Sequence, residues 1–174
     1  MGHPPHHVVF GREVYVAPTA YIAGDVVIGD ECTIMHHVVI RGDVAPIRIG
    51  RRVNIQDGAV LHCNRDVTLD IGDEVAIGHR AVVHCKRIGP RSLIGIGALM
   101  LDGVEIGGGC IVAPGAVVPP GTVVPDGKVL MGVPAQVVRD ANDRDRAYHA
   151  RVIDGYKMLR RLHAAGEYPP ARPE

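Results

Sequence analysis

Aliphatic side chains recur every six residues along most of this chain. The run begins at Val16, continues through Ile22, Ile28 and Ile34, and reaches Leu130 after three short slips in phase. A glycine often follows the aliphatic residue directly. Side chains alternate between the two faces of a strand, and glycine tolerates the positive φ of a tight corner. Each six-residue unit therefore predicts one short strand, with its aliphatic side chain pointing inward, and one corner at the glycine.

About twenty such units follow one another, which indicates a repeat architecture. Three units would form a coil of about 18 residues, and successive coils would stack about 4.8 Å apart, as strands do in any sheet. The pattern predicts an all-β solenoid shaped as a triangular prism over residues 16–138, preceded by an N-terminal segment at residues 1–15. A β-sandwich, or another type of solenoid, would need this period to arise by chance.

The pattern changes in the C-terminal segment, residues 139–174. Between residues 141 and 163, apolar side chains fall three or four places apart with charges between them, as on one face of a helix. Gly155 lies inside this stretch and lowers its intrinsic helix propensity. We expect one amphipathic α-helix that packs along the prism, followed by a loose tail from Gly166.

Composition agrees with this architecture and excludes several classes of protein. The 22 glycines and 13 prolines are too many for a helical bundle, and a single Phe with no Trp suits a narrow aliphatic core. Lys plus Arg and Asp plus Glu each total 19, so we expect no nucleic-acid partner. No apolar stretch suits a signal peptide or a membrane span, and the four cysteines form no close pair. We therefore expect a cytoplasmic protein with reduced thiols and no membrane association.

Two histidines occupy matching places on consecutive coils. His62 and His84 are 22 residues apart, which equals one coil of 18 plus the four-residue insertion VTLD. Leu61 and Val83 belong to the inward series, so the side chains that follow them should point outward. Two imidazoles stacked in this way can bind one metal ion at about 2.0–2.1 Å. The alternative is a chance pairing of solvated histidines.

A third histidine, His79, cannot easily join this pair within one chain. It lies five residues before His84, on the preceding face of the prism, and five residues of strand span roughly 16 Å. A corner separates the two residues, so their side chains would not close the gap. In a threefold assembly, however, His79 could complete the site of a neighbouring chain.

The segments that contain these histidines resemble the γ-class carbonic anhydrase family. The resemblance rests on RGDVAPIRIGRRVNIQDGAVLH (41–62), on IGHRAVVHCKRIGPRSLIGIGALMLDG (77–103) and on the MGVPA turn before the terminal helix. It implies a left-handed parallel β-helix with one C-terminal helix, a homotrimer, and CO2 and bicarbonate as substrates. It also implies that His62 and His84 bind a metal from one subunit and His79 from the next. Zn2+ is the expected cofactor, with Fe2+ or Co2+ as alternatives, because imidazole suits all three.

The same resemblance suggests roles for five further residues. Arg41 and Asp57 would form an ion pair across the subunit interface. Asp43 would position the substrate and the hydroxide, and Gln56 would hydrogen-bond to the metal-bound water. Tyr156 matches a helix tyrosine that reaches toward the metal in relatives with short loops.

Three neutral histidines leave a fourth position open on the metal, as in catalytic zinc sites. Metal-bound water would lose a proton near pH 7, and the resulting hydroxide would attack CO2. The chain departs from the archetype of the family at Val44, directly after RGD, and at Arg65, three residues after the first histidine ligand. The archetype has acidic residues at both places, whereas neither of these side chains can relay a proton near neutral pH. We therefore expect proton export through water and buffer.

Two other classes of function remain open. A metal-dependent acyl-CoA thioesterase would keep three histidines at ligand spacing, whereas a hexapeptide acyltransferase uses a single catalytic histidine. The chain could also be a non-catalytic subunit of a larger assembly, a role that the intact His62, His79 and His84 disfavour. Stopped-flow CO2 hydration beside an acyl-CoA hydrolysis screen would separate these classes.

Overall fold

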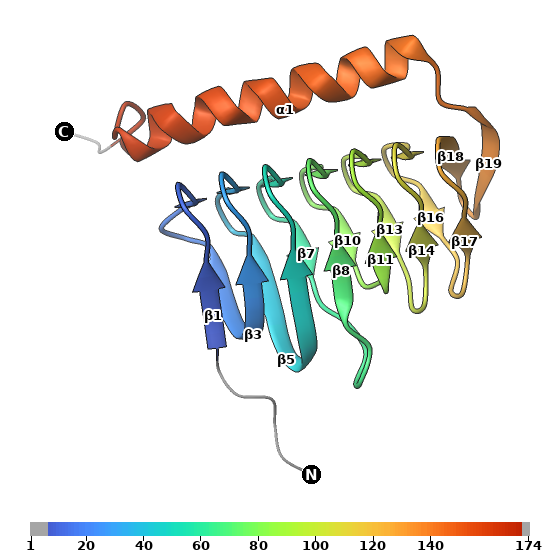
Figure 1. The fold of residues 1–174 in the computed structure, drawn as a ribbon, viewed down its shortest axis with the longest axis horizontal. Helices are drawn as coiled ribbons and strands as arrows, with labels where there is room; N and C mark the ends of the chain where they lie inside the picture. Colours follow the sequence, from blue (N-terminus) through green and yellow to red (C-terminus); the bar gives the residue numbers. More distant parts are fainter. Residues whose placement is uncertain (1–6, 172–174) are drawn as a thin grey trace.

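The computed structural model describes residues 7–171, and the predicted solenoid is confirmed there. The chain forms a left-handed parallel β-helix of about seven coils, and one C-terminal helix, α1, lies along it (Figure 1). The coils stack through parallel pairs of short strands, with the aliphatic residues in register. Val83, for example, pairs with Leu61 on one side and with Met100 on the other.

The larger sheet has eleven strands and covers two faces of the prism. β5 bends around a corner, so that Val39 in its first half pairs with Val60, whereas Arg48 in its second half pairs with Asp70. β1 pairs with β3, so the solenoid already includes residues that precede the first repeat recognised in the sequence. The strands of this sheet are β1 (His7–Phe10), β3 (Tyr21–Ile28), β5 (Val39–Ile49), β7 (Val60–Leu61), β8 (Leu69–Ile71), β10 (Val82–Val83), β11 (Arg87–Ile88), β13 (Leu99–Met100), β14 (Glu105–Ile106), β16 (Val117–Val118) and β17 (Val123–Val124).

The smaller sheet has eight strands and forms the third face, which α1 covers. Its last two strands make an antiparallel hairpin in which Gly132 pairs with Ala135, and this hairpin leads the chain away from the prism toward the helix. The strands are β2 (Tyr15–Val16), β4 (Thr33–Ile34), β6 (Asn54–Ile55), β9 (Ala76–Ile77), β12 (Leu93–Ile94), β15 (Ile111–Val112), β18 (Lys128–Gly132) and β19 (Ala135–Asp140).

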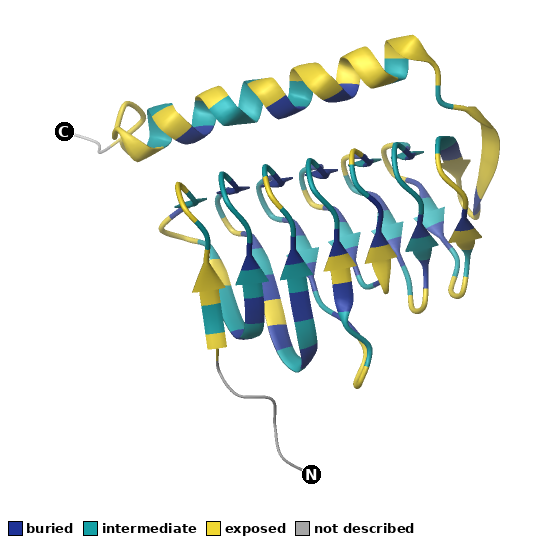
Figure 2. Ribbon diagram, in the orientation of Figure 1, coloured by how far each residue is buried: buried dark blue, intermediate teal, exposed yellow. Residues whose placement is uncertain are grey.

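The inward aliphatic side chains form a single core along the prism axis. Buried residues recur from coil to coil along the ribbon (Figure 2). Each buried Ile, Leu or Val contributes roughly 1.5–3 kcal/mol through burial, so the repeat itself is the main source of stability. The four cysteines are free and buried in this core, and burial raises the pKa of Cys85 to about 12. The largest fully buried side chains are those of Ile28, Ile34, Ile40, Ile47, Ile55, Leu61, Leu69, Ile77, Ile88, Ile94, Met100 and Ile106.

The glycine of each repeat has a different role from the one that the sequence predicts. Gly78, directly after the inward Ile77, is not among the residues with positive φ; Arg80, two places later, has φ of 55°. A Cβ on Gly78 would instead lie 2.7 Å from the backbone nitrogen of Ile96 in the next coil. The expectation that this glycine supplies the left-handed corner was therefore wrong. It is needed because successive coils approach too closely there for a side chain.

The helix α1 (Asp143–Ala164) begins two residues later and ends one residue later than predicted. Asn142 caps it, because its side chain accepts hydrogen bonds from the backbone of Arg144 and Asp145, and the Asp145 carboxylate accepts one from the Asn142 backbone. This reciprocal capping box satisfies backbone donors that would otherwise lack partners. The helix continues through Gly155. Among residues 7–171, no helix has the length and apolar character needed to cross a bilayer.

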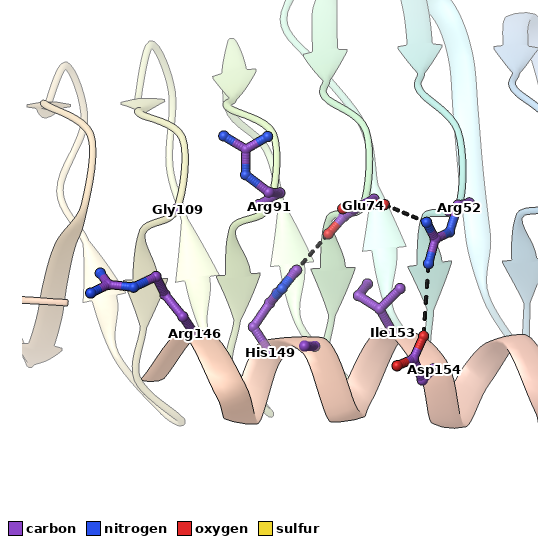
Figure 3. A pocket seen from close by; sticks show the side chains of 9 residues that line it. Arg52, Glu74, Arg91, Gly109, Arg146, His149, Ile153 and Asp154 are labelled. Carbon is purple, nitrogen blue, oxygen red and sulfur yellow. Dashed lines mark hydrogen bonds and ion pairs between the residues drawn. The ribbon is translucent and has the colours of Figure 1, made fainter. Parts of the chain in front are cut away.

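Polar contacts fix one flank of α1 to a corner of the prism (Figure 3). His149 is only 9% exposed, and its Nε2–H donates to the carbonyl oxygen of Glu74 at 2.7 Å. Arg52 donates to the Glu74 carboxylate at 2.6 Å and lies 3.8 Å from the carboxylate of Asp154. Near the C-terminal end of the helix, the buried Arg160 pairs with Glu13 at 3.0 Å. These contacts hold the helix at one position along the prism.

Candidate functional site

His62 and His84 lie together at the corner where the two faces of the larger sheet meet. The backbone places them there, because the amide of His62 donates to the carbonyl of Val83, one coil further along. His62 Nδ1 lies 3.1 Å from His84 Nε2, and the two ring centroids are 5.2 Å apart. Both imidazoles are partly shielded from solvent. The insertion that separates the two histidines in sequence thus leaves them stacked in space.

The remaining nitrogen of each of these rings lies within hydrogen-bond distance of a carboxylate. Asp43 Oδ1 lies 3.2 Å from His62 Nε2, and Asp102 Oδ1 lies 2.6 Å from His84 Nδ1. Because an ionised carboxylate only accepts hydrogen bonds, these two ring nitrogens must be the N–H donors. In neutral rings, the facing atoms His62 Nδ1 and His84 Nε2 then both carry lone pairs.

The electrostatics of this corner favour the neutral form of the His62 ring. Burial, followed by the charge of Arg41, lowers the pKa of His62, so the neutral ring is favoured. Burial alone would raise the pKa of Asp43, but hydrogen bonds from Arg41 and His62 outweigh it and hold the pKa below its usual range. Arg41 donates to Asp43 at 2.6 Å. Hydrogen bonds from Asn64 and His84 lower the pKa of Asp102.

His79 belongs to a separate cluster at the other edge of the same face. Its Nδ1 lies 3.1 Å from Asp57 Oδ2, and its Nε2 lies 3.5 Å from the hydroxyl of Tyr156 on α1. Burial, with a smaller contribution from Asp57, raises the pKa of Tyr156 to about 12, so this hydroxyl stays protonated and can donate to the ring. Gln56 is buried nearby, and its amide donates to Asn54 at 3.0 Å.

One chain therefore brings together some of the residues that the sequence singles out and separates others. Arg41, Asp43, His62 and His84 share one corner, whereas Gln56, Asp57, His79 and Tyr156 share another. Arg41 pairs with Asp43 within the chain, and Asp57 pairs with His79, so the expected pair of Arg41 with Asp57 across an interface stays a prediction. Within the described range 7–171, no group of three or more His, Cys, Asp or Glu side chains is arranged to hold a metal ion.

The donor geometry of the first corner nevertheless fits a shared metal. Two nitrogens bound tetrahedrally at 2.0–2.1 Å lie about 3.3 Å apart, close to the observed 3.1 Å. Facing lone pairs repel unless a cation lies between them, and the carboxylates of Asp43 and Asp102 prevent the rings from turning their N–H groups inward. Metal-binding histidines almost always donate their other N–H to such an acceptor. His79 has the same arrangement, because its Nδ1–H faces the Asp57 carboxylate.

Asp102 is the site residue that sequence reasoning missed. The strand register pairs Val83 with Met100, so Leu101 rather than Asp102 occupies the place above His84. A search for side chains exactly one coil apart in register passes over it. The signal was an exposed acidic residue in the LMLDG segment, one position beyond the matched place.

Comparisons with known proteins identify relatives across most of the chain. The family described as bacterial transferase hexapeptide (six repeats) matches residues 7–42 and 86–120. A Geobacillus kaustophilus protein named carbonic anhydrase is 48% identical over 141 residues, which are 78% of each chain. The mitochondrial gamma carbonic anhydrase 1 of Arabidopsis thaliana is 36% identical over 93% of this chain and 61% of its own length.

Among solved structures, one Bacillus cereus protein is similar over nearly the whole chain. It is provisionally described as an acetyltransferase. It superposes with a TM-score of 0.88 at 34% identity, over 92% of this chain and 93% of its own. The same fold thus occurs in relatives that are named for two different activities.

Proposed function

Because the chain belongs to the γ-class carbonic anhydrase family, we propose that it hydrates CO2 reversibly to bicarbonate at a metal site shared between subunits. His62 and His84 of one chain would hold the metal together with His79 of a second copy. The observation that carries the proposal is the pair of facing ring nitrogens 3.1 Å apart, each backed by a carboxylate on the other side of its ring.

Each chain would carry two half-sites, His79 at one edge and His62 with His84 at the other. The positions of these half-sites support a ring of three chains. His79 precedes β10 and His84 follows it, so the half-sites lie at opposite edges of one face of the prism. A head-to-tail contact that joins one edge to the opposite edge of the next chain closes into a ring when the rotation is threefold.

The residues of this chain have distinct tasks in the proposed reaction. A Zn2+, Fe2+ or Co2+ ion held by three imidazoles would supply a bound water whose pKa is about 7 for zinc. Asp43 and Asp102 would keep the rings in the ligating tautomer. Asp57 would orient His79 by accepting from its Nδ1–H, and the Tyr156 hydroxyl, which contacts the His79 Nε2 that the metal would take, would give up that contact when the metal binds. Gln56 would offer an amide for hydrogen bonding. Val44 and Arg65 carry no group that titrates near pH 7, so water and external buffer would remove the proton.

Chain mixing tests the shared site directly. A His79→Ala chain and a His62→Ala chain should each be inactive alone. In a ring that contains both, only one junction joins an intact His62 and His84 pair to an intact His79, so about one third of the activity should return. Stopped-flow CO2 hydration on purified mixed trimers measures it. Mixed trimers that stay inactive, while wild-type trimers are active, would show that the sites are built differently.

An acyl-CoA reaction is the second candidate, and the acetyltransferase description of the Bacillus cereus structure favours it. A hydrolysis screen with acyl-CoA esters, run on the same metal-loaded protein, should give no turnover if CO2 is the substrate. Acyl-CoA turnover without CO2 hydration would favour a thioesterase or acyltransferase function for this site. Lack of both activities in fully loaded protein would favour a role as an assembly subunit.

A further inference from the structure

A second cavity, of about 390 Å³, lies between α1 and the smaller sheet, on the flank of the helix opposite to the one in Figure 3. Its volume is within the range of small-molecule sites, about 300–1,000 Å³, and far exceeds the needs of CO2 or bicarbonate. Most of its wall is apolar, with branched side chains from strand and helix. The apolar lining includes Leu93, Ile94, Ile96, Ile111, Val152 and Leu159.

Small residues keep this cavity open. Gly155 lies in the interior of α1, where glycine costs about 1 kcal/mol relative to alanine, and a Cβ placed on it would meet no atom within 4 Å. Ala76 and Gly95 line the facing wall on the sheet, although the close approach of Pro114 in the next coil by itself requires a glycine at position 95. Packing therefore does not require the glycine in the helix, and a larger side chain there would extend into free space beside the cavity.

The polar groups of the cavity are few. Gln56, His79 and Tyr156 form one polar cluster. On the helix, the Arg151 guanidinium lies over the ring of Tyr148, 5.7 Å from its centroid. Of the arginines in α1 that line a cavity, Arg146 pairs with Asp143, whereas no carboxylate in the part of the chain described pairs with Arg151. The cavity thus combines an apolar body with one cation that lacks an anionic partner.

We propose that this cavity binds a small monocarboxylate with an apolar chain. The carboxylate would pair with Arg151, and the chain would pack against the aliphatic wall in the space that Gly155 leaves. Binding there needs no metal, so the inference stands or falls separately from the CO2 reaction. Because the cavity adjoins His79, its occupant would lie beside the proposed metal site and would be placed to modulate access to it.

Calorimetric titration of the intact protein with hexanoate, after removal of metal by a chelator, tests the proposal. Hexanoate should bind more tightly than hexanol or hexylamine, because only the acid offers an anion to Arg151. Arg151→Gln should weaken hexanoate binding about fivefold and leave hexanol unaffected. Arg144→Gln, which removes another exposed arginine of α1 without a paired carboxylate, is the matched control and should leave hexanoate binding unchanged.

Gly155→Leu should occupy the part of the cavity beside the helix that the hexanoate chain would take, and weaken hexanoate binding by at least about tenfold. The helix should become no less stable, since leucine is the better helix former. Ala147→Leu places the same side chain at an exposed position of the helix outside the cavity and should leave hexanoate binding unchanged. Hexanoate that binds Gly155→Leu as well as wild type, that binds no better than hexanol, or that binds only when metal is restored would overturn the proposal.

Discussion

On two neighbouring faces of the prism, the outward side chains stack in columns, and one column is apolar whereas the other is charged. On the face that runs through β7, β10 and β13, the outward side chains stack as Val39, Val60, Val82, Leu99 and Val117. On the face that runs through β8, β11 and β14, the matching column reads Arg48, Asp70, Arg87 and Glu105. Both columns arise from the same parallel pairing within one sheet, so the backbone does not distinguish them.

This difference indicates which face a second chain would cover. Charges of alternating sign stabilise one another across neighbouring strands and stay hydrated, so the charged face needs no partner surface and is stable when exposed to water. The apolar column leaves hydrophobic surface half-buried, and it lies between the His79 edge and the edge with His62 and His84. Burying the apolar face against another copy would bring the two edges together. The chemistry and the assembly of this protein are therefore proposed to depend on the same face.

The largest expected effect comes from placing a charge in the apolar column. Leu99→Glu should prevent assembly, because burying an unpaired carboxylate is costly, and CO2 hydration should fall by at least about a hundredfold. Light scattering during size exclusion would report the mass. Val123→Lys also introduces a charge, but into the column of the charged face and opposite Glu105, where Val123 is already 71% exposed, and it should leave both mass and activity unchanged. Equal behaviour of the two variants would remove the proposed distinction between the faces.

The next effect concerns Asp102, at the corner where the two faces meet. Asp102→Asn removes the charged acceptor at His84 Nδ1, so metal affinity should fall about 10–100-fold, as is typical when a residue that hydrogen-bonds to a histidine ligand is replaced. Competition with a zinc-binding dye would measure this without reference to activity. Asp70→Asn, on the charged face, should have no effect on metal affinity. If both variants bind metal like wild type, Asp102 does not position the ligand.

These residues also show how far the sequence alone could reach. The period of six determined the solenoid and the stacking of His62 on His84, because both depend only on counting along the chain. The role of Gly78 and the hydrogen bond from His84 to Asp102 depend on how closely coils approach and how far side chains reach across them, which no period reports. The cavity beside Gly155 depends on where the helix lies relative to the sheet. Almost all of the fold could be predicted from the sequence. Of the candidate site, the stacking of His62 on His84 could be predicted but the contact with Asp102 could not, and a metal site completed by His79 stays a prediction.

A smaller effect is expected at the bend of β5, where Val44 lies between the two faces. If buffer removes the proton, CO2 hydration in the wild type should rise about tenfold or more when dilute buffer is replaced by concentrated imidazole buffer. Val44→Glu should reduce this dependence, since a carboxylate near the site can relay protons. Val123→Glu, remote from that bend, should keep the full buffer dependence. Fast turnover of the wild type in dilute buffer would show that another group already exports the proton.

The smallest effect concerns the third face, which α1 covers instead of a second chain. Burial lowers the pKa of His149 from 6.5, so as pH falls the unfolded chain takes up its proton before the folded one does. The group therefore stabilises the fold above about pH 6.5, and this contribution is lost as pH falls below that value, by about 1.4 kcal/mol per unit of pKa difference. The surrounding charges are those of Arg52, Glu74, Arg91, Arg146 and Asp154.

His149→Gln keeps a donor for the Glu74 carbonyl but cannot titrate. The free energy of unfolding by urea should therefore differ less between pH 7.5 and pH 5.5 in this variant than in the wild type. An identical loss of stability in both proteins would place the pH sensitivity elsewhere, with His62, whose pKa is also lowered by burial, as the next group to replace.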